Sequence, residues 1–459
     1  MPYKVDKVRG KYLVVSMLGG WDFLDNEEYT QLNTLNLKKG SKLFNRLKEK
    51  GVIVEGSGGL DKCIDDYRCT NLNLFTDVGL HIAVLTNRCN LRCLYCQTNS
   101  KAQNDMSKDV ATKILEFVFS GRNPNATIEF QGGEPLLNWD VLRFFVEYTR
   151  KYNLTGKGIN LSLVSNFTLL DQKKLNFLID NGVGLCTSLD GPKKIHDKNR
   201  KMLNGGSSYD KVIFWVNKIR KEYKKRNIKD KTLGFLPTLT KHNLLLYKEV
   251  VDEYVELGQI SIPLRPLNRL GLAKEKWKEI GYTAEEFINF WTKSMDYILS
   301  LNKKGTFIYE RMAYVMLKKI LRKEDPGYVD LCSPCGAGRS VVAYSPEGDV
   351  YTCDEARMIG EDLFKLGNVV EDSYHKILGN PVSLQTCQAS LLDFWDYSSP
   401  YSVWGGTCPV LNYVEQGSPV VKIAQSGLYK IQTAQFKYLF AKIAEDGEDL
   451  KIFKKWVCN

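Results

Sequence analysis

Residues 85–97, LTNRCNLRCLYCQ, end an apolar strand in a loop that carries three cysteines. Cys89, Cys93 and Cys96 follow the run HIAVLT with C-x3-C-x2-C spacing. Three thiolates this close together can hold three irons of one cubane cluster, which leaves the fourth iron open to a small molecule. On spacing alone two alternatives remain: a zinc site, which needs a fourth ligand, and inert buried thiols.

Five further apolar runs follow the cysteine loop, and helical periodicity separates them. The runs are ATIEFQ, INLSLVS, VGLCTSL, LGFLPTLT and QISIPLRPL. Strands joined by helical crossovers lie parallel, so the pattern predicts an α/β fold built on a parallel sheet. Six strand–helix units are too few for a closed eightfold barrel but fit a partial (β/α)6 TIM barrel, placed here at residues 78–272.

Polar motifs stand at the ends of three of these strands, where barrel chemistry belongs. They read FQGGEP, SNFTLL and SLDGPKKIHDKNR. Together with the cysteine loop, these motifs closely resemble those of the radical SAM superfamily. The resemblance implies a [4Fe–4S] cluster on the three cysteines, with S-adenosylmethionine (SAM) bound to its free iron.

The same resemblance implies which residues contact SAM. Glycines let backbone carbonyls approach a ligand, and a carboxylate pairs with an ammonium, as an arginine fork does with a carboxylate. The alternative is that the arginine and serines are ordinary surface and turn residues. Phe167 replaces a glycine usual in the family. Asp190, in an Asp-Gly turn, and His196, at a helix end, are interpreted as structural. The implied SAM contacts are Gly132, Gly133 and Glu134 at the amino group, Ser165 and Asn166 as polar positions, and Ser188 and Arg200 at the ribose and carboxylate.

A second group of cysteines lies in LCSPCGAGRSVVAYSPEGDVYTCDEAR, which resembles the SPASM extension of radical SAM peptide maturases. That extension normally holds two auxiliary clusters, but three of its cysteine positions here are Trp395, Ser398 and Trp404. The resemblance therefore implies one auxiliary [4Fe–4S] cluster, with tryptophans filling the lost site; a zinc site is the alternative. The implied ligands are Cys332, Cys335, Cys353 and Cys408.

Asp354 follows Cys353 directly, and some relatives place a proton-accepting carboxylate there. A carboxylate between cluster and substrate can take the proton that an oxidised substrate loses. The alternatives are a helix N-cap and a salt bridge. Among the remaining cysteines, Cys186 is interpreted as core, and Cys387 as a substitute ligand or an unpartnered thiol.

The rest of the chain divides into smaller units. Residues 1–60 are similar in layout to PqqD-like modules, which bind a leader peptide by β-strand addition; a packing extension of the barrel is the alternative. Within them, KYLVVSML predicts a strand. The segments WDFLDNEEYTQLNTLN and GSKLFNRLKEKGVIV predict two helices and a closing strand, and the glycine-bearing, acidic segment EGSGGLDKCIDD is interpreted as a link. The remaining units are a helical bridge at 273–325, a SPASM/twitch-like auxiliary-cluster domain at 326–420 and C-terminal helices at 421–459.

Net charge, hydrophobic runs and cysteine content limit the classes of protein to which the chain can belong. The 459 residues carry a net charge of +11 that is spread along the chain, which favours solvated helix faces over a nucleic-acid surface. No run approaches 18 uncharged apolar residues, so no membrane helix is expected. Twelve cysteines without a signal-peptide layout predict a reducing compartment, hence a cytoplasmic protein.

The C-terminal motifs RPLNRLGLA, CGAG, YTCDEARMI and CPVLNY resemble maturases of the His-Xaa-Ser peptide system. The resemblance implies a 5′-deoxyadenosyl radical that abstracts hydrogen from a ribosomally made precursor peptide, with a flavodoxin or ferredoxin as one-electron reductant. A crosslink of the C–C or ether cyclophane type is the favoured product. The alternatives are peptide epimerisation, with Cys387 or Cys458 as hydrogen donor, and a non-catalytic cluster scaffold.

Overall fold

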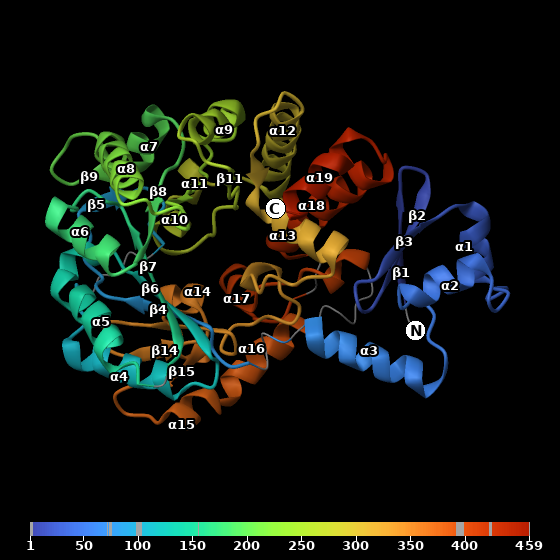
Figure 1. Ribbon diagram of the computed structural model, residues 1–459, viewed down its shortest axis with the longest axis horizontal. Helices are drawn as coiled ribbons and strands as arrows, with labels where there is room; N and C mark the ends of the chain where they lie inside the picture. The colour runs from blue at the N-terminus through green and yellow to red at the C-terminus, as the bar shows by residue number, and fades with distance from the viewer. Residues whose placement is uncertain are drawn as a thin grey trace.

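The computed structural model describes residues 3–70, 72, 76–97, 103–154, 156–391, 399–421 and 425–458. Figure 1 shows a sheet-and-helix body at one end, a small module made of the first residues at the other, and helices from the C-terminal part between them. Among the described residues, no helix is long and apolar enough to cross a membrane.

The body is built on an eight-stranded sheet of order β10-β8-β7-β6-β4-β13-β14-β15. Its first five members are mutually parallel and alternate with helices along the chain, which confirms the predicted parallel α/β fold. Side chains 126, 128 and 130 of the second strand are buried, whereas 127, 129 and 131 are half-buried. This period-2 alternation leaves one face of the strand for helix packing and the other for the barrel interior. The five strands are β4 (Leu80–Val84), β6 (Asn125–Gln131), β7 (Gly158–Ser165), β8 (Gly184–Ser188) and β10 (Gly234–Leu236).

Amphipathic helices cover the outer face of these strands (Figure 1). Phe130 of β6, for example, packs its ring 5.4 Å from that of Phe145. The crossover helices are α4 (Lys108–Ser120), α5 (Trp139–Tyr152), α6 (Gln172–Asp180), α7 (Lys193–Asn199), α8 (Ser208–Lys225) and α9 (Tyr247–Glu256).

The sixth predicted strand is shorter than expected and lies outside this sheet. Only β11 (Ser261–Ile262) forms, and it pairs in parallel with β12 (Tyr309–Glu310). Pro263 and Pro266 follow at once, and proline cannot donate to a strand ladder, so the pairing ends there.

The auxiliary segment is joined directly to the barrel sheet. Strand β13 (Val341–Tyr344) runs parallel to β4, and the antiparallel strands β14 (Asp349–Tyr351) and β15 (Lys365–Asn368) continue the sheet. His81 of β4 lies 2.8 Å from the Tyr344 hydroxyl through Nδ1 and is almost fully buried. The cysteines of residues 332–353 are therefore held by the same sheet as the first cysteine loop.

This junction predicts an acid-sensitive stability. Burial lowers the pKa of His81 from 6.5 to about 3. The unfolded chain therefore binds a proton that the folded chain excludes, so stability is complete above pH 6.5 and falls as the pH drops below it. Between pH 7.5 and 5.5 we expect His81 alone to cost about 1.4 kcal/mol of unfolding free energy. Urea unfolding of the wild type and of His81→Gln at both pH values measures this, and equal pH dependence in the two proteins would refute it.

The N-terminal module is a three-stranded antiparallel sheet followed by helices. Where helix was expected from Trp21 onward, residues 21–24 form the third strand, because the helix starts only after the Asp25 cap, whose side chain and that of Glu28 form a capping box. No closing strand forms at 51–55, and the glycine-bearing segment interpreted as a link is helical. The elements are β1 (Tyr3–Val8), β2 (Lys11–Ser16), β3 (Trp21–Leu24), α1 (Asn26–Asn33), α2 (Lys42–Glu49) and α3 (Gly56–Thr70).

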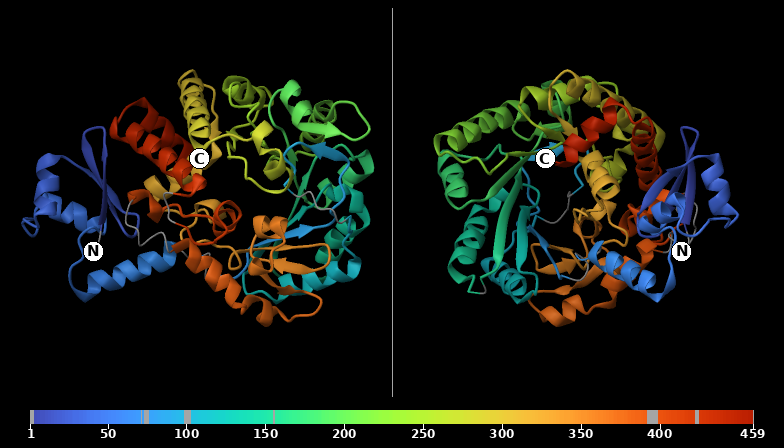
Figure 2. Two further views of the ribbon diagram at one scale, coloured as in Figure 1. Left: turned by 180° about the vertical axis from the view of Figure 1, so that it is seen from behind. Right: turned by 45° about the vertical axis from the view of Figure 1, so that its right-hand side comes forward.

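The C-terminal helices fix this module to the body (Figure 2). The Trp21 ring lies 5.1 Å from that of Phe440, and its Nε1–H donates to the Ile320 carbonyl at 2.9 Å. Tyr401 donates its hydroxyl hydrogen to Asp6 at 2.8 Å, so β1 is also engaged. The helices of this region are α12 (Ala284–Lys303), α13 (Arg311–Leu317), α18 (Gly427–Ala444) and α19 (Glu448–Cys458).

Candidate active site

The first cysteine loop lies at the carboxyl end of β4 and is ordered by its own backbone. Short strand β5 (Leu91–Cys93) pairs with β9 (Arg200–Met202), which places Cys93 opposite Arg200. Burial raises the pKa of Cys89 to about 11 and that of Cys93 to about 12. The neighbouring Cys96 adds to both shifts, and the positive charge of Arg200 opposes both. Thiols of this kind stay protonated on their own but ionise when a metal supplies positive charge.

Two glycines clamp this loop to the end of β6. Gly133 donates its N–H to the Thr86 carbonyl, and the next N–H, of Glu134, donates to Arg88, both at 2.8 Å. A Cβ on Gly132 would lie 2.5 Å from the Thr86 oxygen, and one on Gly133 would lie 2.2 Å from the Arg88 oxygen. Only glycine permits this backbone approach. The glycines therefore position the cysteine loop, whatever ligand their carbonyls meet.

Glu134 joins the ends of β6 and β7. Its side chain is fully buried. It accepts from the Ser165 hydroxyl at 2.7 Å, the Asn166 N–H at 2.8 Å and the Leu136 N–H at 3.0 Å. Burial raises the carboxyl pKa, and these three donors oppose the shift. The structure thus gives this carboxylate a bracing role that the motif did not indicate.

Asn166 ties the third motif to the cysteine loop. Its side-chain amide donates to Asn90 at 3.0 Å, and its carbonyl accepts from Thr168. Phe167 adopts a left-handed φ of 58° and is fully buried. The turn that usually has glycine is therefore kept, and packing of the aromatic ring offsets the backbone strain.

Arg200 is held by a buried carboxylate. Its Nε–H donates to both oxygens of Asp190 at 3.1 Å, and its guanidinium lies 5.2 Å from the centre of the Tyr95 ring. Asp190 also accepts from the Tyr95 hydroxyl at 2.6 Å and the Thr238 N–H at 2.9 Å. His196 is fully buried and its Nδ1 accepts from the Asp190 N–H at 3.4 Å, which agrees with a structural role.

Polar side chains also face one another across the barrel interior. Ser188 is half-buried at the end of β8. Glu129 of β6 interacts electrostatically with Asp354 and Arg311, and burial raises its pKa. Cys186, expected in the core, is half-buried beside the same glutamate and arginine, and burial raises its pKa to about 12. Glu129 was not among the predicted site residues, although the alternation along β6 indicates that its side chain faces the barrel interior.

Asp354 begins helix α14 (Asp354–Ile359) and accepts from Arg357 Nε at 2.9 Å. The salt bridge that was one of its alternatives is therefore present. Among the described side chains, Arg357 Nη2 is buried without a hydrogen-bond partner. A carboxylate and an unused guanidinium N–H thus lie together beside the barrel interior.

The second cysteine group lines one small cavity of about 20 Å³. Cys353, Cys335 and Cys408 interact electrostatically, and burial raises the pKa of all three thiols. Asp330 and Glu355 supply the carboxylates of the lining, and Arg265 donates to Asp330 at 2.5 Å. The structure thus brings together all four predicted auxiliary ligands, Cys332, Cys335, Cys353 and Cys408.

Within the ranges described, no three His, Cys, Asp or Glu side chains are arranged to hold one metal ion. Cys387 lies on α16 (Pro381–Leu391) and is not among the residues that line the four-cysteine cavity. It does interact electrostatically with Cys335, which lines that cavity. Trp404 packs on Phe436 and Phe440, whereas residues 395 and 398 lie outside the described residues.

Comparison with known proteins agrees with this arrangement. The family model "Radical SAM superfamily" matches residues 83–245. The chain is 25% identical over 325 residues to a cysteine-type anaerobic sulfatase-maturating enzyme of Clostridium novyi, covering 68% of this chain and 82% of that one.

Solved structures share the fold. One is anSMEcpe with bound AdoMet and Cp18Cys peptide, at TM-score 0.66 and 22% identity, covering 81% of this chain and 99% of that one. Another is Streptococcus suis SuiB bound to precursor peptide SuiA, at TM-score 0.56 and 12% identity, covering 92% and 97%. The family match implies a [4Fe–4S] cluster and SAM. Residues 83–245 form a radical SAM domain, and the chain is similar in sequence to sulfatase-maturating enzymes and in fold to SuiB.

Proposed function

We propose that this enzyme matures a ribosomally made precursor peptide by forming an intrapeptide crosslink between side chains, of the C–C or ether cyclophane type. The observation that carries the proposal is the four-cysteine cavity beside Asp354, on the same sheet as the first cysteine loop. Crosslinking removes two hydrogens from the peptide. One leaves as a hydrogen atom, and the other leaves as a proton and an electron, which need separate acceptors close to the substrate.

The residues present fit the groups that this chemistry requires. Cys89, Cys93 and Cys96 would hold one [4Fe–4S] cluster, and the four cavity cysteines would hold an auxiliary one. Gly132, Gly133, Ser188 and Arg200 would bind SAM, with Glu134, Ser165 and Asn166 bracing them. With SAM bound and a flavodoxin or ferredoxin as reductant, the first cluster would supply the electron that cleaves SAM into methionine and a 5′-deoxyadenosyl radical, and the auxiliary cluster would supply an electron acceptor.

Asp354 would accept the proton. It lies against the barrel interior near Glu129 and accepts a hydrogen bond from Arg357, which also offers an unused N–H to a peptide carbonyl. We expect Asp354→Asn to lower the rate of crosslinked product by about a hundredfold or more, with hydrogen abstraction retained. Product and 5′-deoxyadenosine, measured together by mass spectrometry, test this: a parallel loss of both would contradict a proton-accepting role.

The auxiliary cluster has its own test. The wild type is expected to bind about eight irons per chain, and Cys353→Ala about four, because the cubane at the cavity is lost while that of the first loop remains. Iron and zinc are counted after anaerobic reconstitution, with Cys458→Ala, an exposed thiol at the chain end, as control. One zinc in place of the second set of irons would show that the cavity holds zinc.

We favour a precursor peptide over a sulfatase as the substrate, because the neighbour with a bound precursor peptide covers more of this chain than the sulfatase-maturating neighbour does. SuiB covers 92% of this chain, whereas anSMEcpe covers 81% at nearly its full length. We propose that the N-terminal module at residues 1–60 recognises the leader by strand addition to its three-stranded sheet, whose edges are β1 and β3. Sulfatase maturation remains the second candidate because of the sequence relatives, and epimerisation with a cysteine donor is the third.

A further inference from the structure

We propose that a groove beside the N-terminal module binds an acidic, extended segment of the peptide substrate. The inference rests on the proposed function for the substrate being a peptide. It concerns a site distinct from the sheet edge and from both cysteine groups.

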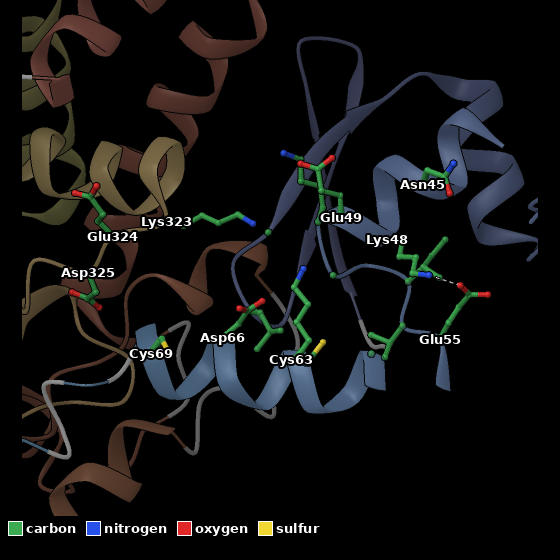
Figure 3. Close-up of a pocket in the computed structure, with 18 of the residues that line it drawn as sticks. Asn45, Lys48, Glu49, Glu55, Cys63, Asp66, Cys69, Lys323, Glu324 and Asp325 are labelled. Carbon is green, nitrogen blue, oxygen red and sulfur yellow. Dashed lines mark hydrogen bonds and ion pairs between the residues drawn. The ribbon is translucent and has the colours of Figure 1, made fainter. Parts of the chain in front are cut away.

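The groove has three walls and a volume of about 820 Å³ (Figure 3). The first wall is the end of α2 with the loop that follows, and the second is one face of α3, from Gly59 to Cys69. The third wall is the segment 323–325, which follows the short helix η3 (Lys318–Arg322) of the bridge. The size is that of a ligand site. Because the bridge supplies one wall, a bound segment would be fixed relative to the barrel.

The acidic groups of the lining are largely neutralised by the chain itself. Glu55 pairs with Lys48 at 2.6 Å, Glu324 with Lys318 at 2.8 Å, and Asp325 with Lys319 at 2.8 Å. Asp66 also interacts within the chain. These carboxylates therefore offer little to a basic ligand.

Three lysines of the lining are uncommitted. Within the described ranges, Lys50, Lys62 and Lys323 take part in no ion pair or side-chain hydrogen bond. Glu49 is the one carboxylate of the described lining that is likewise unpaired. Figure 3 shows Lys323 extending from the bridge into the groove. One amine comes from each wall, so the positive charge surrounds the groove, and this arrangement complements an acidic segment.

The floor is partly apolar. Leu18, Ile53, Val54 and Leu72 line it, and Leu72 is 58% exposed. A peptide that alternates acidic and apolar residues satisfies both features, because side chains of an extended chain point alternately to opposite sides. A nucleic acid would gain from the lysines but would leave the apolar floor unused.

The test measures binding without turnover. Reconstituted full-length enzyme is titrated with fluorescein-labelled (Glu-Leu)6, and with (Lys-Leu)6 as the probe of opposite charge. We expect the acidic peptide to bind more tightly, and the variant K50E/K62E/K323E to weaken it by about tenfold or more at low salt. The matched control is K38E/K42E/K211E, three exposed lysines outside the groove with the same change in charge.

A second readout does not depend on the variants. Cys69 lines the groove, and Cys458 is exposed at the end of α19, so alkylation of the two thiols can be compared by mass spectrometry. Bound (Glu-Leu)6 is expected to protect Cys69 and not Cys458. Equal binding of the two peptides, equal binding by the groove and control variants, or no protection of Cys69 would overturn the groove. None of these outcomes depends on cluster chemistry, so failure of the proposed function would show separately as absence of modified peptide.

Discussion

Gly133→Ala is expected to abolish cluster binding at the first cysteine loop. The added Cβ would lie 2.2 Å from the Arg88 carbonyl oxygen and 2.6 Å from its carbon. Both are backbone atoms, so the loop itself must move and the 2.8 Å bonds to Thr86 and Arg88 are lost. We expect the variant to bind about four fewer irons per chain and to form 5′-deoxyadenosine at least about a hundredfold more slowly.

The control for this change is Gly427→Ala. A Cβ there meets nothing within 4 Å, and the residue lies at the start of α18, away from the cysteine loop. Iron content and 5′-deoxyadenosine formation are measured for both variants under strictly anaerobic conditions. A Gly133→Ala protein with wild-type iron content would show that the glycine does not position the loop.

Asp190→Asn is expected to destabilise the fold and to weaken SAM binding together. The carboxylate is fully buried, and it alone neutralises Arg200 within the described part of the chain. Removing one partner of a buried pair leaves an uncompensated charge, which costs about 3–5 kcal/mol. Arg200 would also lose its fixed orientation over Tyr95, so we expect SAM to bind at least about tenfold more weakly.

Asp210→Asn is the matched control for this prediction. Asp210 pairs with Lys193 at 2.5 Å, but both side chains are more than half exposed, so we expect little loss of stability. Urea unfolding and SAM titration of both variants give the comparison. If Asp190→Asn differed from the wild type no more than Asp210→Asn does, the bracing role of Asp190 would be wrong.

The hydrophobic pattern of neighbouring residues was sufficient to predict most of the barrel. The strands that carry the cysteine loop and the three polar motifs form where apolar runs predicted them, because alternation and helical periodicity are properties of neighbouring residues. The motifs also converge, since the carboxyl ends of parallel strands meet at one edge of the sheet.

Pairings between distant segments could not be predicted in this way. Strand β13 pairs with β4 across more than 250 residues, and nothing within either strand specifies the other. The packing of Trp21 on Phe440 is equally remote. The helix prediction was wrong at residues 21–24, because Asp25 caps the helix and leaves Trp21–Leu24 to pair with β2.

The roles of individual side chains were harder to predict than their positions. Glu134 was expected at the SAM amino group, yet its oxygens accept from three protein donors. Asp190 was assigned to a turn, yet it anchors Arg200 and Tyr95. A motif reports which residue occurs, whereas its hydrogen-bond partners depend on side chains brought in by other strands.

Peptide crosslinking is tested most directly by co-expressing the enzyme with a candidate precursor peptide and measuring the mass of that peptide, with a parallel culture in D2O. The account predicts a loss of two hydrogens per modification, no deuterium at a Cα position, and fragment ions that place a new bond between two side chains. An unchanged mass in H2O, with one deuterium gained at a Cα in D2O, would contradict crosslinking and identify the enzyme as an epimerase.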